Sequence, residues 1–392
     1  MTATTRVDPT DARADAHLIT SDERLLPFDG LRGLAAASVV FYHLEQMLYV
    51  PVRVLGGGHL LVDLFFILSG FVIARQYQAS IVEGRIGFGS YAVRRLARLY
   101  PAYLVAFVAV ILMEAVGLRH LGEAPRFRRD APILSTFLQL TLLHNAGLRT
   151  AAWNFPAWSV SVEWIVNLLF FVLVKRFRGG PPAILLGVVY LCTASLMQLS
   201  SKTLDLDLWE GNYGFLNAGL ARGLVGFSLG VVIFGQHRLL PKLRPGVLHS
   251  LEIAIVAGAL VGLTRRIQPF YVGVDHVSVL FFFPALVTLC LYRSGWLARL
   301  LAMRVPVFLG TISYSVYVLH VPLLNLVTPI YTKVPSPWNT IAYGALLLAA
   351  SYLCYRFIEM PGRAMIRRWE TSWRAAHAGM ATSGDPRPAP AA

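Results

Sequence analysis

Apolar runs of about twenty residues recur along this chain, separated by glycine, proline and charged residues. At a rise of about 1.5 Å per residue, a helix of roughly twenty apolar residues crosses the hydrocarbon layer of a bilayer. Hydrophobic residues make up 56% of the 392 residues and charged residues only 14%, which excludes an ordinary soluble domain. We therefore expect an all-α, polytopic membrane protein with about ten transmembrane helices. The predicted spans are 28–50, 59–76, 97–117, 157–175, 182–200, 213–235, 247–265, 276–292, 305–330 and 338–359.

The two ends of the chain differ from this membrane domain, which we expect to cover residues 25–370. Residues 1–24 are polar and lack the apolar stretch of a signal peptide, so they predict a disordered cytoplasmic N-terminus. Residues 371–392 end in a proline-rich stretch and predict a disordered cytoplasmic tail. A further segment, 132–147, is too short and polar for a clear span, and could be re-entrant or interfacial.

The net charge of +14 could indicate a nucleic-acid partner, but the arrangement of the charges favours membrane topology instead. Arginine and lysine gather in alternate loops, whereas the loop 201–212 is acidic. This pattern predicts that both termini are cytoplasmic in the cell membrane, although the loop 118–156 also holds five arginines on the outer side. The basic residues of the predicted inner loops are Arg75, Arg85, Arg94, Arg95, Arg98, Lys175, Arg176, Arg178, Arg238, Lys242, Arg244, Arg293, Arg299, Arg304, Arg363, Arg367 and Arg368.

The first predicted span carries two ionisable residues that a simple anchor would lack. Arg32 and His43 are eleven positions apart, so they share one helix face at a separation of roughly 16 Å along the axis. Such residues are costly inside a membrane and commonly mark functional sites. The alternatives are that Arg32 extends to the headgroups and that His43 only bonds a neighbouring helix.

Three further titratable residues, Asp63, Glu163 and His320, are predicted at about the depth of His43 in the outer half of the membrane. A carboxylate bonded to one imidazole nitrogen fixes the tautomer and raises the basicity of the other. That arrangement predicts His43 as a general base for a hydroxyl, oriented by Asp63 or Glu163. The alternatives are a helix cap for Asp63, an ion pair for Glu163, and for His320 a bond to a carbonyl freed by Pro322.

On the inner side, Arg95 and Arg98 stand three positions apart on one helix. Both guanidinium groups can therefore face the same anion, and arginine suits phosphate in particular. The alternative is the ordinary basic flank of a cytoplasmic helix end.

The cysteines give no sign of a metal or disulfide. Cys192, Cys290 and Cys354 all lie in apolar segments, and no pair has metal-ligand spacing. We expect no metal site.

Taken together, six segments resemble the acyltransferase 3 family of membrane-bound O-acyltransferases over nearly all of residues 25–370. Their order in the chain is that of the family. Two positions depart from the pattern: Trp164 stands where a second acidic residue often follows Glu163, and Leu319 replaces an aromatic residue. The segments are FDGLRG at 28–33 with His43, VDLFFILSGF at 62–71, RLARLYP at 95–101, WSVSVE at 158–163, ISYSVYVLHVP at 312–322 and RFIEMP at 356–361.

This resemblance implies transfer of an acyl group, often acetyl, from acyl-CoA to a hydroxyl of a sugar, glycan, lipid or macrolide-type natural product. It also implies that Arg32 and His43 match the family's essential arginine and histidine, and that Arg95 and Arg98 match its donor-associated motif. The length predicts a form without the extracytoplasmic hydrolase-like domain of many members.

On this hypothesis, the CoA phosphates lie against Arg95 and Arg98, the pantetheine arm passes Arg32, and the thioester reaches His43. A membrane transporter for a small polar or lipid-linked substrate remains the alternative, since ionisable residues inside a membrane also mark transport pathways. A scaffold without chemistry is a third reading, which the presence of both Arg32 and His43 argues against.

Overall fold

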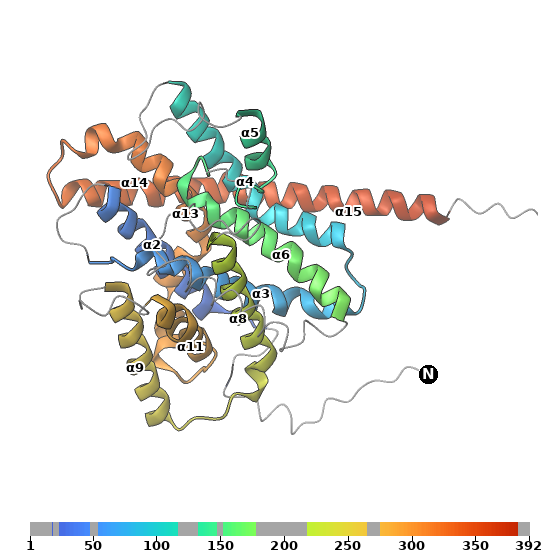
Figure 1. The fold of residues 1–392 in the computed structure, drawn as a ribbon, viewed down its shortest axis with the longest axis horizontal. Coiled ribbons are helices and arrows are strands. Elements are labelled where there is room, and N and C mark those ends of the chain that lie inside the picture. The colour runs from blue at the N-terminus through green and yellow to red at the C-terminus, as the bar shows by residue number, and fades with distance from the viewer. Residues whose placement is uncertain are drawn as a thin grey trace, which may run out of the picture.

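The computed structural model describes residues 18, 23–47, 54–116, 132–146, 152–177, 218–264 and 275–382, and these ranges are helical apart from short connections and one isolated bridge. The predicted all-α fold is confirmed. Figure 1 shows the helices as one bundle. They are α2 (Leu26–Met47), η1 (Gly58–Leu60), α3 (Leu61–Val82), α4 (Phe88–Ala115), α5 (Pro132–Leu140), η3 (Phe155–Ala157), α6 (Trp158–Phe177), α8 (Ala218–Gln236), η4 (His237–Leu239), α9 (Pro245–Thr264), the π-helical η5 (Ser278–Phe282), α11 (Phe283–Leu289), α12 (Trp296–Leu301), α13 (Arg304–Tyr331), α14 (Trp338–Cys354), the π-helical η6 (Tyr355–Glu359) and α15 (Met360–Thr382).

Several of these helices are built to cross a membrane. In the described ranges, 7 helices are long and apolar enough to do so. The predicted span 182–200 lies outside the described residues, and the span at 276–292 is a shorter apolar helix, Asp275–Leu289. The first predicted span is α2, which is not among the seven and carries Asp29, Arg32 and Glu45.

Small residues let the central helices approach closely. α2 lies along α13, where a Cβ on Gly33 would come within 2.4 Å of the Gly310 backbone nitrogen. α3 lies along α8, where Cβ atoms on Gly70 and Gly230 would each meet a carbonyl oxygen of the facing helix at 2.0 Å. Close backbone contact of this kind drives helix association in membranes, where the hydrophobic effect contributes little.

Burial separates a central helix from peripheral ones. In α3, 83% of the most apolar stretch is buried within the protein, whereas the corresponding value is 28% for α9 and 22% for the rod formed by α14 and α15. Apolar side chains on the outside of these peripheral helices suit contact with lipid. The polar residues buried around α3, α2 and α13 must therefore form hydrogen bonds and ion pairs with one another.

Parts of both ends that the sequence predicts to be disordered are among the residues that the structure describes. Within the N-terminal stretch expected to be disordered, Leu18 is buried, pairs with Tyr292 and accepts a hydrogen bond from Arg293. The tail expected to be disordered from residue 371 instead continues α15 to Thr382. An ion pair between Glu370 and Arg374, four positions apart, supports that last stretch of helix.

The segment 132–147 forms the short helix α5, whose 9 residues end at Leu140. This helix is too short to cross a bilayer, as its length in the sequence predicted. It packs its buried side beneath α4, where the Tyr103 hydroxyl donates to the Gln139 carbonyl at 2.9 Å. α5 is therefore an anchored surface helix.

Candidate active site

Two imidazoles from different helices meet inside the bundle. Nδ1 of His43, on α2, lies 2.8 Å from Nε2 of His320, on α13, and the two rings stack with centroids 4.9 Å apart. The second nitrogen of His320, Nδ1, lies 2.6 Å from the Tyr317 carbonyl oxygen. Both histidines are buried. The structure thus joins two of the four residues that the sequence placed at one depth.

The hydrogen-bond partners fix the tautomers of this pair. A carbonyl oxygen only accepts, so Nδ1 of His320 must carry its hydrogen and donate it to Tyr317. Neutral His320 then accepts at Nε2, and His43 donates to it from Nδ1. Nε2 of His43 is consequently left with its lone pair, ready to receive a proton.

The alternative explanation for His320, a bond to the carbonyl freed by Pro322, does not hold. That carbonyl belongs to Val318, four residues earlier, and it accepts a hydrogen bond from the Asn154 side chain at 2.8 Å. The backbone around His320 is held separately, because the Tyr343 hydroxyl donates to the His320 carbonyl at 2.7 Å. Nε2 of His320 is therefore available to accept the hydrogen bond from His43.

Asp63 does not orient His43, contrary to the sequence prediction. Its two carboxylate oxygens accept from Arg222 on α8, at 3.1 Å to Nε and 2.6 Å to Nη2. Both side chains are almost fully buried, and Arg222 also donates to the His59 carbonyl and lies over the Trp158 ring. A full charge in a forked geometry binds a buried carboxylate more strongly than a neutral imidazole does, which explains the different partner.

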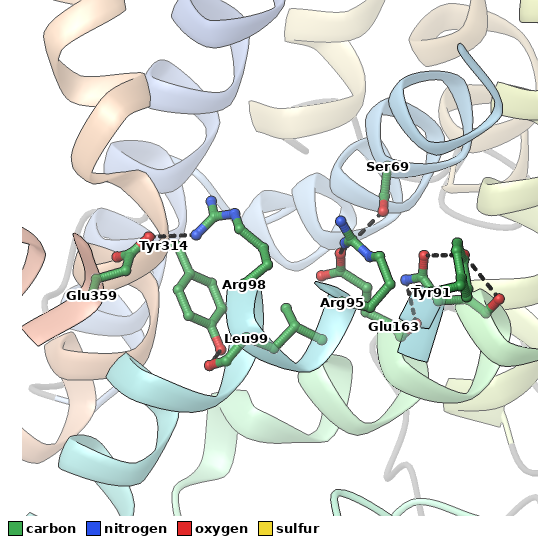
Figure 2. A network of polar contacts seen from close by, with 9 residues as sticks. Ser69, Tyr91, Arg95, Arg98, Leu99, Glu163, Tyr314 and Glu359 are labelled. Carbon is green, nitrogen blue, oxygen red and sulfur yellow. Dashed lines mark hydrogen bonds and ion pairs between the residues drawn. The ribbon is translucent and has the colours of Figure 1, made fainter. Parts of the chain in front are cut away.

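Glu163 does not reach His43 either. Its Oε1 accepts from Ser69 at 3.1 Å and from Arg95 at 3.2 Å, which joins α6, α3 and α4 (Figure 2). Behind this contact, Asn167 donates to the Glu163 carbonyl at 2.7 Å. Glu163 therefore belongs with the arginines of α4 rather than with the imidazoles, again because the guanidinium is the stronger partner.

Arg98 points from the same helix toward a different carboxylate, as Figure 2 shows. Its Nη1 lies 2.5 Å from Oε1 of Glu359, and its guanidinium carbon lies 5.0 Å from the centre of the Tyr314 ring. The Tyr314 hydroxyl donates to the Leu99 carbonyl at 2.6 Å, which fixes the ring. Arg95 and Arg98 are thus held apart by two separate acidic partners.

These side chains surround a cavity of about 280 Å³ between α2, α3, α4, α6, α13 and α15, which we call the arginine cavity. Its described lining combines apolar side chains, most of them from α3, with basic ones. Glu163 is the only carboxylate among the described lining residues. Six described lining residues are arginines: Arg32, Arg94, Arg95, Arg98, Arg363 and Arg367.

Arg32 reaches this cavity from α2, the helix that also carries His43. It is half-buried and forms no hydrogen bond or ion pair with any side chain in the described ranges. The structure therefore brings Arg32, Arg95 and Arg98 to one cavity. That grouping is the one the sequence predicted for anion binding.

A wall of aromatic rings separates the arginine cavity from the histidine pair. Tyr317 and Phe65 line the cavity and pack edge to face, with centroids 5.7 Å apart. The Tyr317 ring also lies 5.8 Å from the ring of His320. The Tyr317 hydroxyl is held by Ser159 at 2.8 Å and by the Pro156 carbonyl at 3.1 Å. The inner end of the cavity thus lies one aromatic ring away from the imidazoles.

Sequence reasoning missed several residues of this site. Arg222 lies in the middle of a predicted span. An ionisable residue at such a position is a candidate functional residue, so its place in the span could have marked it. Glu359 lay in a quoted segment without a role, and Arg363 and Arg367 counted only as loop charges. No local pattern marks Tyr317 as the wall, because its position depends on packing between α13, α3 and α6.

Comparison with known proteins extends this description. The model of the acyltransferase 3 family, described as "Acyltransferase domain", matches residues 26–356. The chain is 28% identical over 373 residues to the Bacillus subtilis (strain 168) protein "Putative peptidoglycan O-acetyltransferase YrhL", covering 88% of this chain and 56% of that protein. It is 25% identical over 379 residues to a "Putative O-acetyltransferase" of Staphylococcus aureus (strain COL), covering 87% and 58% respectively.

The chain thus spans a little over half the length of these two relatives. A shorter match, 34% identical over 161 residues, is to "Protein 2 in picA locus" of Rhizobium radiobacter and covers 38% of this chain and 81% of that protein. No solved structure matches the chain. Because the family model covers most of the chain, including the histidine pair and most of the arginine cavity, the protein belongs to the acyltransferase 3 family.

Proposed function

We propose that this protein is a membrane O-acyltransferase that moves a short acyl group, acetyl in the simplest case, from acyl-CoA to a hydroxyl. His43 is the general base. The observation that carries this proposal is the pair of hydrogen bonds from His43 through His320 to the Tyr317 carbonyl, which leaves Nε2 of His43 unprotonated. Membership of the acyltransferase 3 family supports the reaction class.

In the proposed reaction, Nε2 of His43 takes the proton of the acceptor hydroxyl as the oxygen attacks the thioester carbonyl. The C–S bond then breaks, and the proton passes from His43 to the departing thiolate, which leaves as free thiol. During this cycle His43 is briefly cationic, and its Nδ1 hydrogen bond to neutral His320 stabilises that state. His320 is therefore a positioning residue, and its own ring orientation is fixed by the Tyr317 carbonyl.

The donor proposal rests on the charge of the arginine cavity. Arg32, Arg95 and Arg98 present guanidinium groups to a space with one lining carboxylate, which suits the phosphates of a CoA ester. The roughly 16 Å between Arg32 and His43 along α2 is a distance that an extended pantetheine arm covers. The acyl end must pass the ring of Tyr317 to reach His43.

For the acceptor, we propose a hydroxyl of a cell-envelope glycan, because the name of the Bacillus subtilis relative specifies peptidoglycan. We also propose that the protein lies in the cell membrane with the arginine cavity open to the cytoplasm, where acyl-CoA is made. Both termini are then cytoplasmic, as the positive charges predicted. A reporter fused after residue 392 that is active only in the cytoplasm tests this orientation.

The central test uses purified protein with acetyl-CoA and muramyl glycan fragments, and it measures free thiol and acetylated product. The wild-type protein should release thiol in step with product, and His43→Ala should not. Donor binding without thiol release from any hydroxyl acceptor would contradict the proposal and favour the transporter alternative.

A further inference from the structure

The arginine cavity is completed by a helix that lies beyond the matched family domain. The family model ends at residue 356, whereas α15 runs from Met360 to Thr382 and supplies Arg363 and Arg367 to the cavity lining. Figure 1 shows α14 and α15 as one rod, with α15 extending past the other helices. Arg363 and Arg367 therefore lie outside the residues that the family model matches.

A buried carboxylate ties the start of this helix to α4. Glu359, the last residue of η6, is fully buried and accepts from Arg98 at 2.5 Å and from Ser315 at 2.7 Å. It also accepts from Arg363, four positions later. One carboxylate therefore holds an arginine from α4 beside an arginine from α15, with both lining the same cavity.

A second buried carboxylate repeats this arrangement eleven positions along the rod. Glu370 accepts from the Ser90 hydroxyl at 2.5 Å and lies 4.0 Å from Arg94, both on α4. It also pairs with Arg374 at 2.9 Å. Because Glu359 and Glu370 both bind α4, helix α15 cannot turn away from the cavity without breaking buried ion pairs.

The charges around the cavity do not balance. Within the described ranges, the six lining arginines have three carboxylates at ion-pair distance, Glu163, Glu359 and Glu370, which leaves an excess of three positive charges among these residues. Arg367 is exposed at the rim and forms no ion pair in the described part of the chain. Such an excess is expected where several anionic groups of one ligand bind.

We propose that α15 forms the phosphate end of the donor site, with Arg363 and Arg367 binding phosphates of the nucleotide part of acyl-CoA. Glu359 is the positioning residue that keeps Arg98 and Arg363 together. This inference rests on the proposed function for the identity of the donor. The recognition itself concerns phosphate, which a CoA ester or a lipid headgroup could supply, and the apolar lining beside it suits the pantetheine arm.

The test compares donors with and without phosphates, using the full chain in a phosphate-free detergent. Acetyl-CoA, 3′-dephospho-acetyl-CoA and acetyl-pantetheine are supplied to the wild type and to Arg367→Met and Arg363→Met. Each variant should raise KM for acetyl-CoA about tenfold with little change in kcat, since one charge-assisted contact is lost. KM for acetyl-pantetheine should stay at the wild-type value, and the smaller effect on the dephospho donor identifies which phosphate is held.

Arg368→Met is the matched control, because Arg368 adjoins Arg367 on the same helix, is exposed, and does not line the cavity. It should behave as the wild type with every donor. Glu359→Gln, which keeps the shape of the side chain and removes its charge, should raise KM for acetyl-CoA and leave that for acetyl-pantetheine unchanged. Equal effects of Arg367→Met on both donors would indicate a structural role and overturn the inference.

Binding of adenosine 3′,5′-bisphosphate gives a readout that does not depend on catalysis. The wild type and Arg368→Met should bind it, and Arg367→Met should bind about tenfold more weakly. If the wild type fails to bind it, or binds anionic lipid vesicles in an Arg367-dependent manner instead, the inference is wrong. If binding behaves as expected but no thiol is released from acetyl-CoA, the proposed function fails while the phosphate site stands.

Discussion

The histidine pair and the arginine cavity lie in one bundle but differ in the charge of the groups around them. Among the described residues, His43 and His320 have no ionised hydrogen-bond partner: the chain of bonds ends at a backbone carbonyl. The arginine cavity, in contrast, collects six guanidinium groups and holds several of them with glutamates. One region keeps its side chains neutral, and the other keeps positive charge in excess.

This difference separates two tasks. For the proposed base His43, an uncharged partner on one ring nitrogen leaves the other nitrogen available to take a proton. Anion binding requires fixed positive charge with good geometry, which ion pairs behind the arginines maintain. The ring of Tyr317 lies between the two regions and keeps the guanidinium groups away from the imidazoles.

The largest expected effect falls on the base of the histidine pair. His43→Ala should lower kcat for acyl transfer by about 10³-fold to 10⁴-fold, because it removes the proposed general base. The KM for acetyl-CoA should change little, since the arginine cavity is intact. His249→Ala, at a half-exposed position on α9, is the control and should retain activity. Substantial turnover by His43→Ala would contradict the assignment of proton transfer to the histidine pair.

The next effect concerns stability and tests whether Asp63 belongs to the chemistry. Asp63→Leu leaves Arg222 buried without its carboxylate and should lower the free energy of unfolding by about 3 kcal/mol or more. Adding Arg222→Met should restore most of that loss and leave kcat close to wild type. Thermal unfolding in detergent and thiol release measure the two quantities. If the double variant is stable but inactive, Asp63 takes part in catalysis.

A smaller effect is expected for His320, which acts through His43. His320→Leu should lower kcat by roughly 10-fold to 100-fold, because the Nδ1 hydrogen of His43 loses its acceptor and the ring is free to turn. His320→Gln places an amide oxygen near the position of Nε2 and should recover part of that activity. If the glutamine and leucine variants are equally impaired, His320 does more than accept this hydrogen bond.

For the arginine cavity, Arg98→Met should raise KM for acetyl-CoA about tenfold while kcat changes little. Added salt should raise the wild-type KM and should affect the variant less, because fewer charges remain to be screened. Steady-state kinetics at two ionic strengths checks both expectations. A fall in kcat with unchanged KM would indicate that Arg98 acts on the reacting atoms instead.

The smallest effect is expected at the wall between the two regions. Tyr317→Phe keeps the ring and removes the hydroxyl bonds to Ser159 and to the Pro156 carbonyl. The free energy of unfolding should fall by about 1 kcal/mol, and kcat should change by less than about threefold. Thermal unfolding and thiol release again provide the measurements. A large loss of activity would show that the hydroxyl itself takes part in transfer.

The sequence predicted the fold class, because hydropathy is a local property, and helical spacing placed Arg95 and Arg98 on one face. The family resemblance added Arg32 to them, and all three line the arginine cavity. The sequence also placed His43 and His320 at one depth. It was wrong about the partners of Asp63 and Glu163, since depth along a helix says nothing about rotation or about which neighbour is nearest. Both carboxylates instead pair with arginines contributed by other helices.

The π-helical turn at Tyr355–Glu359 sets where α15 aims its side chains. Such a turn holds one residue more than an α-helical turn, so each residue after it lies about 100° behind its position on an uninterrupted α-helix of the same sequence. If Tyr355–Glu359 were α-helical instead, α14 and α15 would still form a continuous helix, but Arg363, Arg367 and Glu370 would turn together off the α4 face. The π-helical turn thus decides whether α15 lines the arginine cavity or passes beside it.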